Sequence, residues 1–454
     1  MSAPGATLEL DGPDPGTTPA DDPEAGARPT ALLPLTQLLR ISAYWLGLTA
    51  IDAAVGLFIL NRVEFDGLVP KDDVGRSLFL IGIGGAIIGI IIQPTVGYIS
   101  DFTVSRWGRR KPYIVFGSLL DVVFLLGIAA GNSVLMLAAF VLLLSVSTNI
   151  ARGPFQGYVP DLVAEPQVGL ASGMVGLMQV VGNVTGFLLV SLSVQLGVME
   201  LSLVAVALVE LVTMASVVLK VGKGMPPKPR NGKPWTRIAR EAWATDILRE
   251  RSYVWLLVSR LLFLVGGSLL VNFVVIYLAR AHGMSQEEAN AMYIAVLVVV
   301  VASNVIAILP ASRLSDRIGR KPLIFAACAG GAVGSAIIAL TPSIPIAFVG
   351  AALFGAANGT FLAVDWALMT DIIPRASAGR YMGMSNVATG SAGPLSIAVG
   401  GVALDIVTSA GNEPLSPRVV FILGVAFFVA AAVTLRPVVE PRHDRRPAAQ
   451  PTSA

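Results

Sequence analysis

Two stretches of this sequence, GYISD at 97–101 and RWGRRKP at 106–112, decide the architecture because the chain repeats them. The second copy reads SRLSDRIGRKP at 312–322, and its closing proline lies 210 residues after Pro112. Each copy follows a long apolar segment. The repeat indicates that one structural unit of many residues occurs twice in the chain.

A second motif repeats with the same offset. Asp161 is followed by glycines eight and twelve residues later, and Asp371, which lies 210 residues further on, is followed by glycines at the same two spacings. Two separate motifs that share one offset are difficult to obtain by chance. They predict two tandem units that have the same orientation.

The composition places these units in a membrane. Hydrophobic residues make up 54% of the 454 residues, charged residues only 13%, and the mean hydropathy is +0.74. An ordinary soluble domain has about 25% charged residues, so a water-soluble globule could not cover its surface with so few. Disorder over the whole chain is excluded by the same composition. The lone Cys328 excludes an intramolecular disulfide and a cysteine metal cluster.

The sequence also lacks the signs of an enzyme. We find no nucleophile–base set, no cluster of metal ligands and no phosphate-binding loop. We therefore expect no catalytic activity, no bound metal and no cofactor. The basic residues are scattered among loops, so we expect no nucleic acid as a partner.

Twelve apolar segments are long enough to cross a bilayer, which takes about 20 residues in a helix. Gly and Pro occur inside several of them, and membrane helices tolerate these residues better than soluble ones do. We predict an all-α membrane protein with spans at 36–60, 76–100, 113–130, 133–156, 170–194, 199–221, 253–280, 289–312, 322–341, 344–368, 381–407 and 418–437.

Lys and Arg predict the orientation of these spans. If the N-terminus is cytoplasmic, the cytoplasmic stretches contain 26 of these residues and the outer loops contain five. The remaining one, Arg260, lies inside a segment. Such a bias follows the positive-inside rule. We therefore expect a multi-pass protein of the inner or plasma membrane with both termini in the cytoplasm.

The loop lengths divide the chain into five regions. We expect a disordered tail at 1–34, a six-helix bundle at 35–221, a cytoplasmic linker at 222–252, a second six-helix bundle at 253–438 and a tail at 439–454. Within the linker, apolar residues from Trp235 to Leu248 recur at helical spacing between arginines, which predicts an amphipathic helix on the inner leaflet. A plain solvated linker is the alternative.

The repeated loops carry an Asp–Arg–Asp set in each half. An aspartate at a helix end can accept hydrogen bonds from a neighbouring helix start, and an arginine can bridge two carboxylates. We expect each set to form a cytoplasmic clamp that holds the halves together and breaks when the protein opens inward. The alternative is that these charges only set the topology. The residues are Asp101, Arg109, Arg110 and Asp161 in the first half, and Asp316, Arg320 and Asp371 in the second.

At these residues the chain resembles the glycoside–pentoside–hexuronide:cation symporters of the major facilitator superfamily, and within them the sucrose–proton symporters. The first copy of the loop is longer than the second, as in that group. The segment TNIARGP at 148–154, which leads to Asp161, and Asp365-Trp366, which leads to Asp371, resemble it too. The resemblance implies twelve helices in two pseudo-symmetric six-helix bundles, the major facilitator fold.

The chain departs from that pattern in its fourth span. The sucrose symporters carry there an aspartate that is thought to take the coupling proton, and this chain has Ser145. Arg152 stands where they have glutamine, and Gln156 where they have arginine. These differences put both the coupling site and the sugar in question.

The resemblance implies that spans one, four, seven and ten line a central cavity. A charge in the hydrocarbon core costs at least about 2.5–3.5 kcal/mol, so each one there is a functional candidate. An aromatic ring beside carboxylates and amides suits a sugar, and Trp45 shares a face with Asp52. Two further acids, Asp121 and Glu210, lie on spans outside the cavity and favour a structural role. The predicted binding residues are Asp52, Asn149, Arg152, Gln156, Arg260, Asn358, Asp365 and Trp366.

These residues could also have purely structural roles. Asp52 and Asp365 could only neutralise Arg152 and Arg260 as buried structural pairs, and Arg152 could extend toward the membrane surface. Trp366 suits the protein core or the membrane interface as well as it suits a ligand.

The sequence as a whole favours a secondary transporter that carries a sugar or glycoside together with protons, by alternating access. We expect Asp52 or Asp365 to carry the proton, and sodium is not excluded as the coupling ion. The expected partners are the substrate, the coupling ion and the lipid bilayer, and we expect a monomer. The alternatives are a proton-driven exporter of amphipathic molecules and a transporter-like receptor that no longer transports.

Overall fold

The computed structural model describes residues 31–164, 167–243, 250–372 and 378–440. Within these ranges it has twelve helices that are long and apolar enough to cross a membrane, and no strand. The predicted all-α architecture with twelve spans is therefore confirmed. The predicted tails fall almost wholly outside the described residues.

The spanning helices lie close to the predicted segments. In the first half they are α1 (Leu35–Phe65), α2 (Val74–Asp101), α3 (Lys111–Ala129), α4 (Val134–Gln156), α6 (Val168–Gln195) and α7 (Leu201–Lys220). In the second half they are α9 (Arg251–Asn272), α11 (Gln286–Ile318), α12 (Lys321–Leu340), α13 (Ile344–Ile372), α14 (Ala378–Ser409) and α15 (Ser416–Leu435). Short helices connect them: α5 (Tyr158–Leu162), α8 (Trp235–Glu241) and α10 (Val274–His282).

Local sequence explains several helix starts. The proline that closes each copy of the repeated motif is the second residue of α3 and of α12, where its missing N–H costs nothing. Ser133 caps α4 by accepting from the Met136 amide. Ser285 and Glu288 form a capping box at the start of α11.

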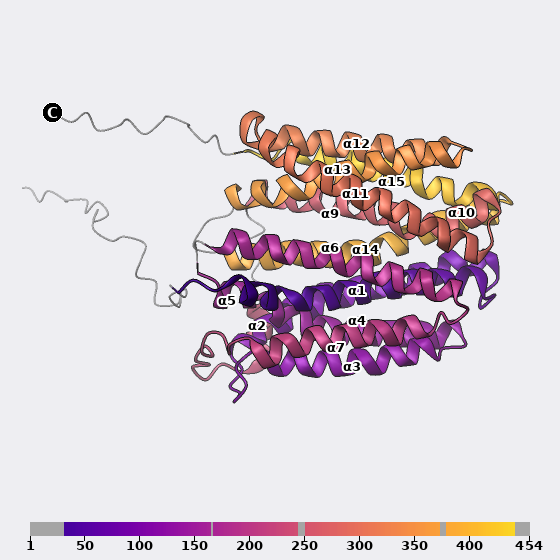
Figure 1. Cartoon of the computed structure of the whole chain (residues 1–454). Coiled ribbons are helices and arrows are strands. Elements are labelled where there is room, and N and C mark those ends of the chain that lie inside the picture. Colours follow the sequence, from indigo (N-terminus) through magenta and orange to yellow (C-terminus); the bar gives the residue numbers. More distant parts are fainter. Residues whose placement is uncertain (1–30, 165–166, 244–249, 373–377, 441–454) are drawn as a thin grey trace, which may run out of the picture.

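The helices form two bundles that follow the two halves of the sequence (Figure 1). In the first half α1 packs on α6 and α7, and α4 on α2 and α3; in the second, α13 packs on α11 and α12, and α15 on α9 and α12. Helix pairs α2–α14 and α6–α11 join the halves. Glycines allow the α2–α14 approach: a Cβ at Gly75 would lie 1.9 Å from the carbonyl oxygen of Gly401.

Because the number of spans is even, residues 31 and 440 lie at the same end of the molecule, which we name the terminal side. Helix α5 lies at this end and α10 at the other, the opposite side (Figure 1). Which side faces the cytoplasm remains a prediction from the charges.

Two predicted elements differ from the structure. The seventh span, predicted as one segment at 253–280, is broken at Phe273 into α9 and α10. The break lies against α14, where Asn272 donates to Ser396 at 3.0 Å and the Phe273 ring packs on Gly400. The linker helix α8 has seven residues and ends at Glu241, where a turn follows; the part of the predicted amphipathic helix at 244–248 lies outside the described residues.

Candidate functional site

In the first half, an ion pair joins α1 to α4. Arg152 donates from Nη2 to Asp52 Oδ2 at 2.6 Å. The Asp52 side chain is 49% exposed, although its neighbours Ile51 and Ala53 are buried and α1 is covered along most of its length. The Arg152 guanidinium faces α14, because its Nη1 would lie 3.6 Å from a Cβ at Gly390. The pair therefore faces the junction between the halves.

In the second half, an ion pair joins α9 to α13. Arg260 donates to Asp365, and also to Thr389 of α14 at 3.3 and 3.1 Å. The Arg260 guanidinium lies 5.5 Å from the centre of the Trp366 ring, within cation–π range. The Asp365 side chain is only 3% exposed, and its Oδ1 has no hydrogen-bond partner among the described residues.

The two pairs are related by the repeat, with their charges exchanged. The first helix of the first half carries the acid and the fourth carries the base, whereas the first helix of the second half carries the base and the fourth the acid. Each pair neutralises two charges that would be costly alone in the membrane. At the junction, each half thus places an ionisable carboxylate against an arginine.

The other predicted binding residues do not join these pairs. Asn149 is buried and donates to the carbonyl oxygen of Ser145 at 2.7 Å within its own helix. Gln156 and Asn358 are partly buried, and in the described ranges no hydrogen bond links either to an ion pair. The Trp45 ring packs in the bundle core against Phe155, with ring centres 5.6 Å apart. Trp45 and Asp52 do lie on the same face of α1, because Phe155 and Arg152, which they contact, both belong to α4, but the ring is buried in the bundle core beside the pair.

The predicted clamp of the first half forms, and its ion pairs among the described residues lie within that half and the linker. Arg109 and Arg110 lie just before α3, and Asp161 lies in α5, which follows α4. Because α3 packs on α4, both arginines reach Asp161. Asp161 accepts from Arg109 at 2.7 Å and from Arg110 at 2.8 Å, and Asp101 lies 3.1 Å from Arg110. Lys228 of the linker donates its amide to the Asp101 carbonyl oxygen at 2.8 Å. These contacts tie the first half to the linker, and the expectation that the clamps hold the two halves together stays a prediction.

The clamp charges shift one another's ionisation. Burial raises the pKa of the Asp161 carboxyl, but the hydrogen bonds and charges of Arg110 and Arg109 outweigh burial and hold it below its ordinary value. Burial lowers the pKa of Arg110, and Asp161 and Asp101 outweigh that effect and raise it. Both groups are therefore charged at neutral pH.

The clamp of the second half is described only in part. Arg320 donates a side-chain N–H to the Ala367 carbonyl oxygen and its backbone N–H to Glu440 at 2.8 Å. The side chains of Asp316 and Asp371 lie outside the described residues, so their pairing stays a prediction. The backbone does repeat: Gly108 and Gly319, which precede the arginines, have φ of 98° and 94°, a region that favours glycine.

Two buried polar residues were not predicted from the sequence as candidate functional residues. Arg280, the last residue of the predicted span 253–280, lies in α10 and donates to Glu64 of α1 at 2.6 and 2.7 Å. In α2, Gln93 is 2% exposed and its Nε2 has no hydrogen-bond partner within the described part of the chain. Both lie where the halves meet. An isolated amide in an apolar helix was the only signal available for Gln93.

Asp121 and Glu210 form a separate cluster inside the first bundle. Ser147 and Thr148 of α4 donate to Asp121, the latter at 2.9 Å, and Tyr44 of α1 donates to Glu210 at 3.2 Å. Both acids are fully buried. The network links α1, α3, α4 and α7, which fits the packing role expected for these acids.

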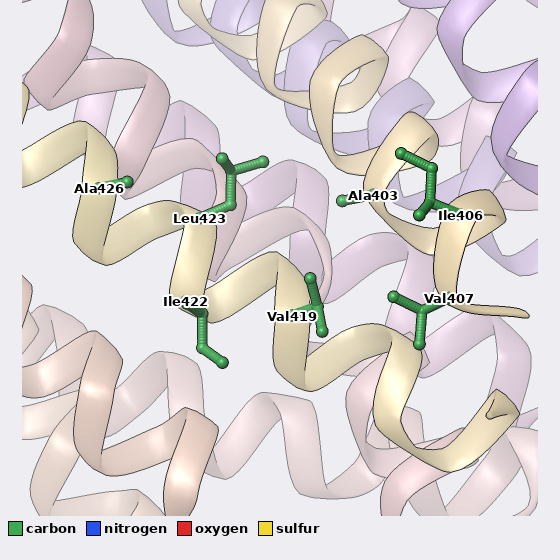
Figure 2. A pocket seen from close by; sticks show the side chains of 7 residues that line it. All are labelled: Ala403, Ile406, Val407, Val419, Ile422, Leu423 and Ala426. Carbon is green, nitrogen blue, oxygen red and sulfur yellow. The ribbon is translucent and has the colours of Figure 1, made fainter. Parts of the chain in front are cut away.

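A groove of about 270 Å³ lies between α14 and α15 (Figure 2). Its lining is wholly aliphatic and includes the exposed Ile406 and Ile422. It offers no hydrogen-bond partner from a side chain. The groove therefore suits hydrocarbon rather than a polar solute.

Twelve spanning helices in two repeated bundles, with ion pairs at the junction of the halves, define a multi-pass membrane transport protein. The chain belongs to the Major Facilitator Superfamily, whose family model matches residues 42–397 and 256–453. The predicted superfamily is thus confirmed. Membership places the chain among transporters rather than enzymes.

Named relatives include sugar permeases. A general alpha-glucoside permease of Schizosaccharomyces pombe is 36% identical over 126 residues, which are 24% of this chain and 23% of the permease. A sucrose transport protein of Arabidopsis thaliana is 30% identical over 125 residues, which are 23% and 21% of the two chains. The match thus spans less than a quarter of the length of these relatives.

The fold is also that of a solved transporter. A D-xylose-proton symporter superposes with a TM-score of 0.64, covering 89% of this chain and 98% of the symporter, at 18% sequence identity. At this identity the likeness concerns the fold alone.

Proposed function

We propose that this protein is a secondary transporter that moves a sugar or glycoside across the cell membrane in symport with protons, by alternating access, with both termini in the cytoplasm. The Asp52–Arg152 pair carries the proposal. Asp52, a half-exposed carboxylate in the middle of the buried helix α1, contacts Arg152 of α4. A group that can change its charge therefore lies at the junction of the halves. The names of the relatives support a sugar as the substrate.

The pair suggests how the two fluxes are coupled. Protonation of Asp52 removes the charge that holds Arg152 and frees its donors for the oxygens of a substrate. Because each event favours the other, proton and substrate bind together, and their coupling is reciprocal. Asp365 and Arg260 offer the same chemistry in the second half.

The test is uptake of sucrose and maltose into proteoliposomes under an imposed proton gradient. Asp52→Asn or Asp365→Asn should abolish accumulation against a gradient, while counterflow, which needs no net proton movement, persists. Asp66→Asn, which changes an exposed carboxylate, serves as the matched control. The assignment fails if both variants still accumulate sugar.

The same assay separates the rivals. Wild-type protein that ignores both sugars but extrudes hydrophobic cations would be an exporter of amphipathic molecules. Binding without any flux would indicate a receptor. Accumulation that follows a sodium gradient instead of a proton gradient would leave the sugar assignment intact and replace the coupling ion.

A further inference from the structure

Gln93 is held in place beside Arg152. Gly153, the residue after Arg152, packs against α2 so closely that a Cβ there would lie 2.3 Å from the Gln93 carbonyl oxygen. The α2 backbone is therefore fixed against α4 at this level. The Gln93 amide and the Arg152 guanidinium both lie beside Gly390 of α14, and we treat them as one polar group at the junction of the halves.

Helix α14 approaches this group with a residue that has no side chain. A Cβ at Gly390 would lie 3.4 Å from Gln93 Oε1 and 3.6 Å from Arg152 Nη1, which are ordinary contact distances. Any longer side chain at this position would occupy the space in front of both polar groups. Position 390 thus controls how much room they have.

The polar atoms of this group have unused hydrogen-bonding capacity. Gln93 Nε2 and Arg152 Nε are both buried, and neither has a hydrogen-bond partner in the part of the chain that the structure describes. Folded proteins pair nearly all such buried groups, so each exception calls for an explanation. In this conformation α14, which belongs to the other half, covers the amide, and separation of the halves would give it access to a solute.

We propose that Gln93 and Gly390 form a specificity-determining subsite, in which the Gln93 amide donates a hydrogen bond to a hydroxyl group of the sugar or glycoside and Gly390 leaves room for its ring. This inference rests on the proposed function. Arg152 Nε offers a second donor to the same molecule. Hydroxyl groups suit these donors because they can accept from either one.

The experiment is a cycle between variants of the protein and of the ligand, measured by equilibrium binding calorimetry. The probes are maltose, sucrose and a monodeoxy series of whichever sugar binds. In the wild type, loss of the hydroxyl group that meets Gln93 should weaken binding by about tenfold, as expected for one lost hydrogen bond. In Gln93→Leu, the parent sugar should bind about as weakly as that deoxy sugar, and the deoxy sugar should lose nothing further.

Matched changes make the result specific. Gln195→Leu alters an exposed glutamine in α6 and should leave binding unchanged. Gly390→Ala should be tolerated, whereas Gly390→Leu should abolish sugar binding although the thermal unfolding profile of the protein is retained.

The outcomes separate the two proposals. If the wild type binds sugar but no deoxy analogue shows coupling to Gln93, or Gly390→Leu binds normally, the subsite is wrong and the proposed function stands. If the wild type binds neither sugar, both proposals fall.

Discussion

At the scale of single residues, the two ion pairs differ in how much water reaches their carboxylates. The Asp52 side chain is 49% exposed and that of Asp365 is 3% exposed. Water can solvate Asp52 if Arg152 moves away, but it cannot reach Asp365 in the same way. The first pair is therefore easier to open than the second, which makes Asp52 the better candidate for a carboxylate that exchanges protons with solution.

This difference predicts unequal effects on stability. Removing one partner of a buried pair leaves an uncompensated charge and costs about 3–5 kcal/mol, so Asp365→Ala should lower the unfolding temperature in detergent strongly. Asp52→Ala should lower it less, because Asp52 occupies a half-exposed position and its removal lets water reach the Arg152 guanidinium. The double change Arg260→Met with Asp365→Leu should recover much of the loss. Equal losses from the two single variants would contradict this account of the pairs.

At the scale of elements, the clamp on the terminal side joins the loop before α3, helix α5 and the linker. Its stability contribution depends on Asp161, whose pKa is held below the ordinary carboxyl value of 3.8 by Arg110 and Arg109 despite burial. A group whose pKa is lowered on folding stabilises the fold at pH values above its unfolded pKa. That contribution is lost as the pH falls through the lowered, folded pKa.

Asp161→Asn should therefore destabilise the protein by about 3 kcal/mol at pH 7. The difference from the wild type should stay constant down to about pH 4 and shrink only below it. Thermal unfolding as a function of pH checks this, with limited proteolysis of the loop at 102–110 as a local readout. A difference that disappears already near pH 6 would point to another titrating group.

The same elements illustrate what sequence could and could not predict. All twelve spans followed from hydropathy, and the contact of Arg109 and Arg110 with Asp161, about 50 residues away, followed from two motifs that recur together in both halves of the chain. The break at Phe273 and the free amide of Gln93 depend on where α14 passes. That packing between the halves leaves no periodic signal in either helix, so the Gln93–Gly390 proximity required coordinates.

At the scale of the whole molecule, the contacts between the halves define the conformation. On the opposite side Glu64 pairs with Arg280, Asn290 donates to Asn61 at 2.8 Å, and the Gly75 amide donates to Asp405 at 2.8 Å. On the terminal side, the ion pairs among described residues stay within the first half and the linker. The structure is therefore closed on the opposite side.

The Glu64–Arg280 pair should act as the lock of that closed side. Its side chains are 4% and 1% exposed, and Arg280 also donates to Thr408 and Ser416 of the second half. Opening on this side must break the pair and hydrate both charges, so Glu64→Gln should shift the population toward the state that is open there. If the variant loses about 1.4 kcal/mol of the free energy that favours the closed state, the ratio of closed to open protein falls by about tenfold.

Disulfide cross-linking can measure this shift. Lys71 and Glu413 form an ion pair between the halves on the same side, so cysteines at both positions, in a Cys328→Ser background, report closure. Glu64→Gln should reduce the cross-linked fraction several-fold relative to the same cysteine pair with Glu64 intact. Asp66→Asn breaks a pair within the first half, with Arg62, and should leave cross-linking unchanged. If Glu64→Gln and Asp66→Asn cross-link equally well, the buried pair does not govern closure, and the α2–α14 glycine packing must hold the side shut.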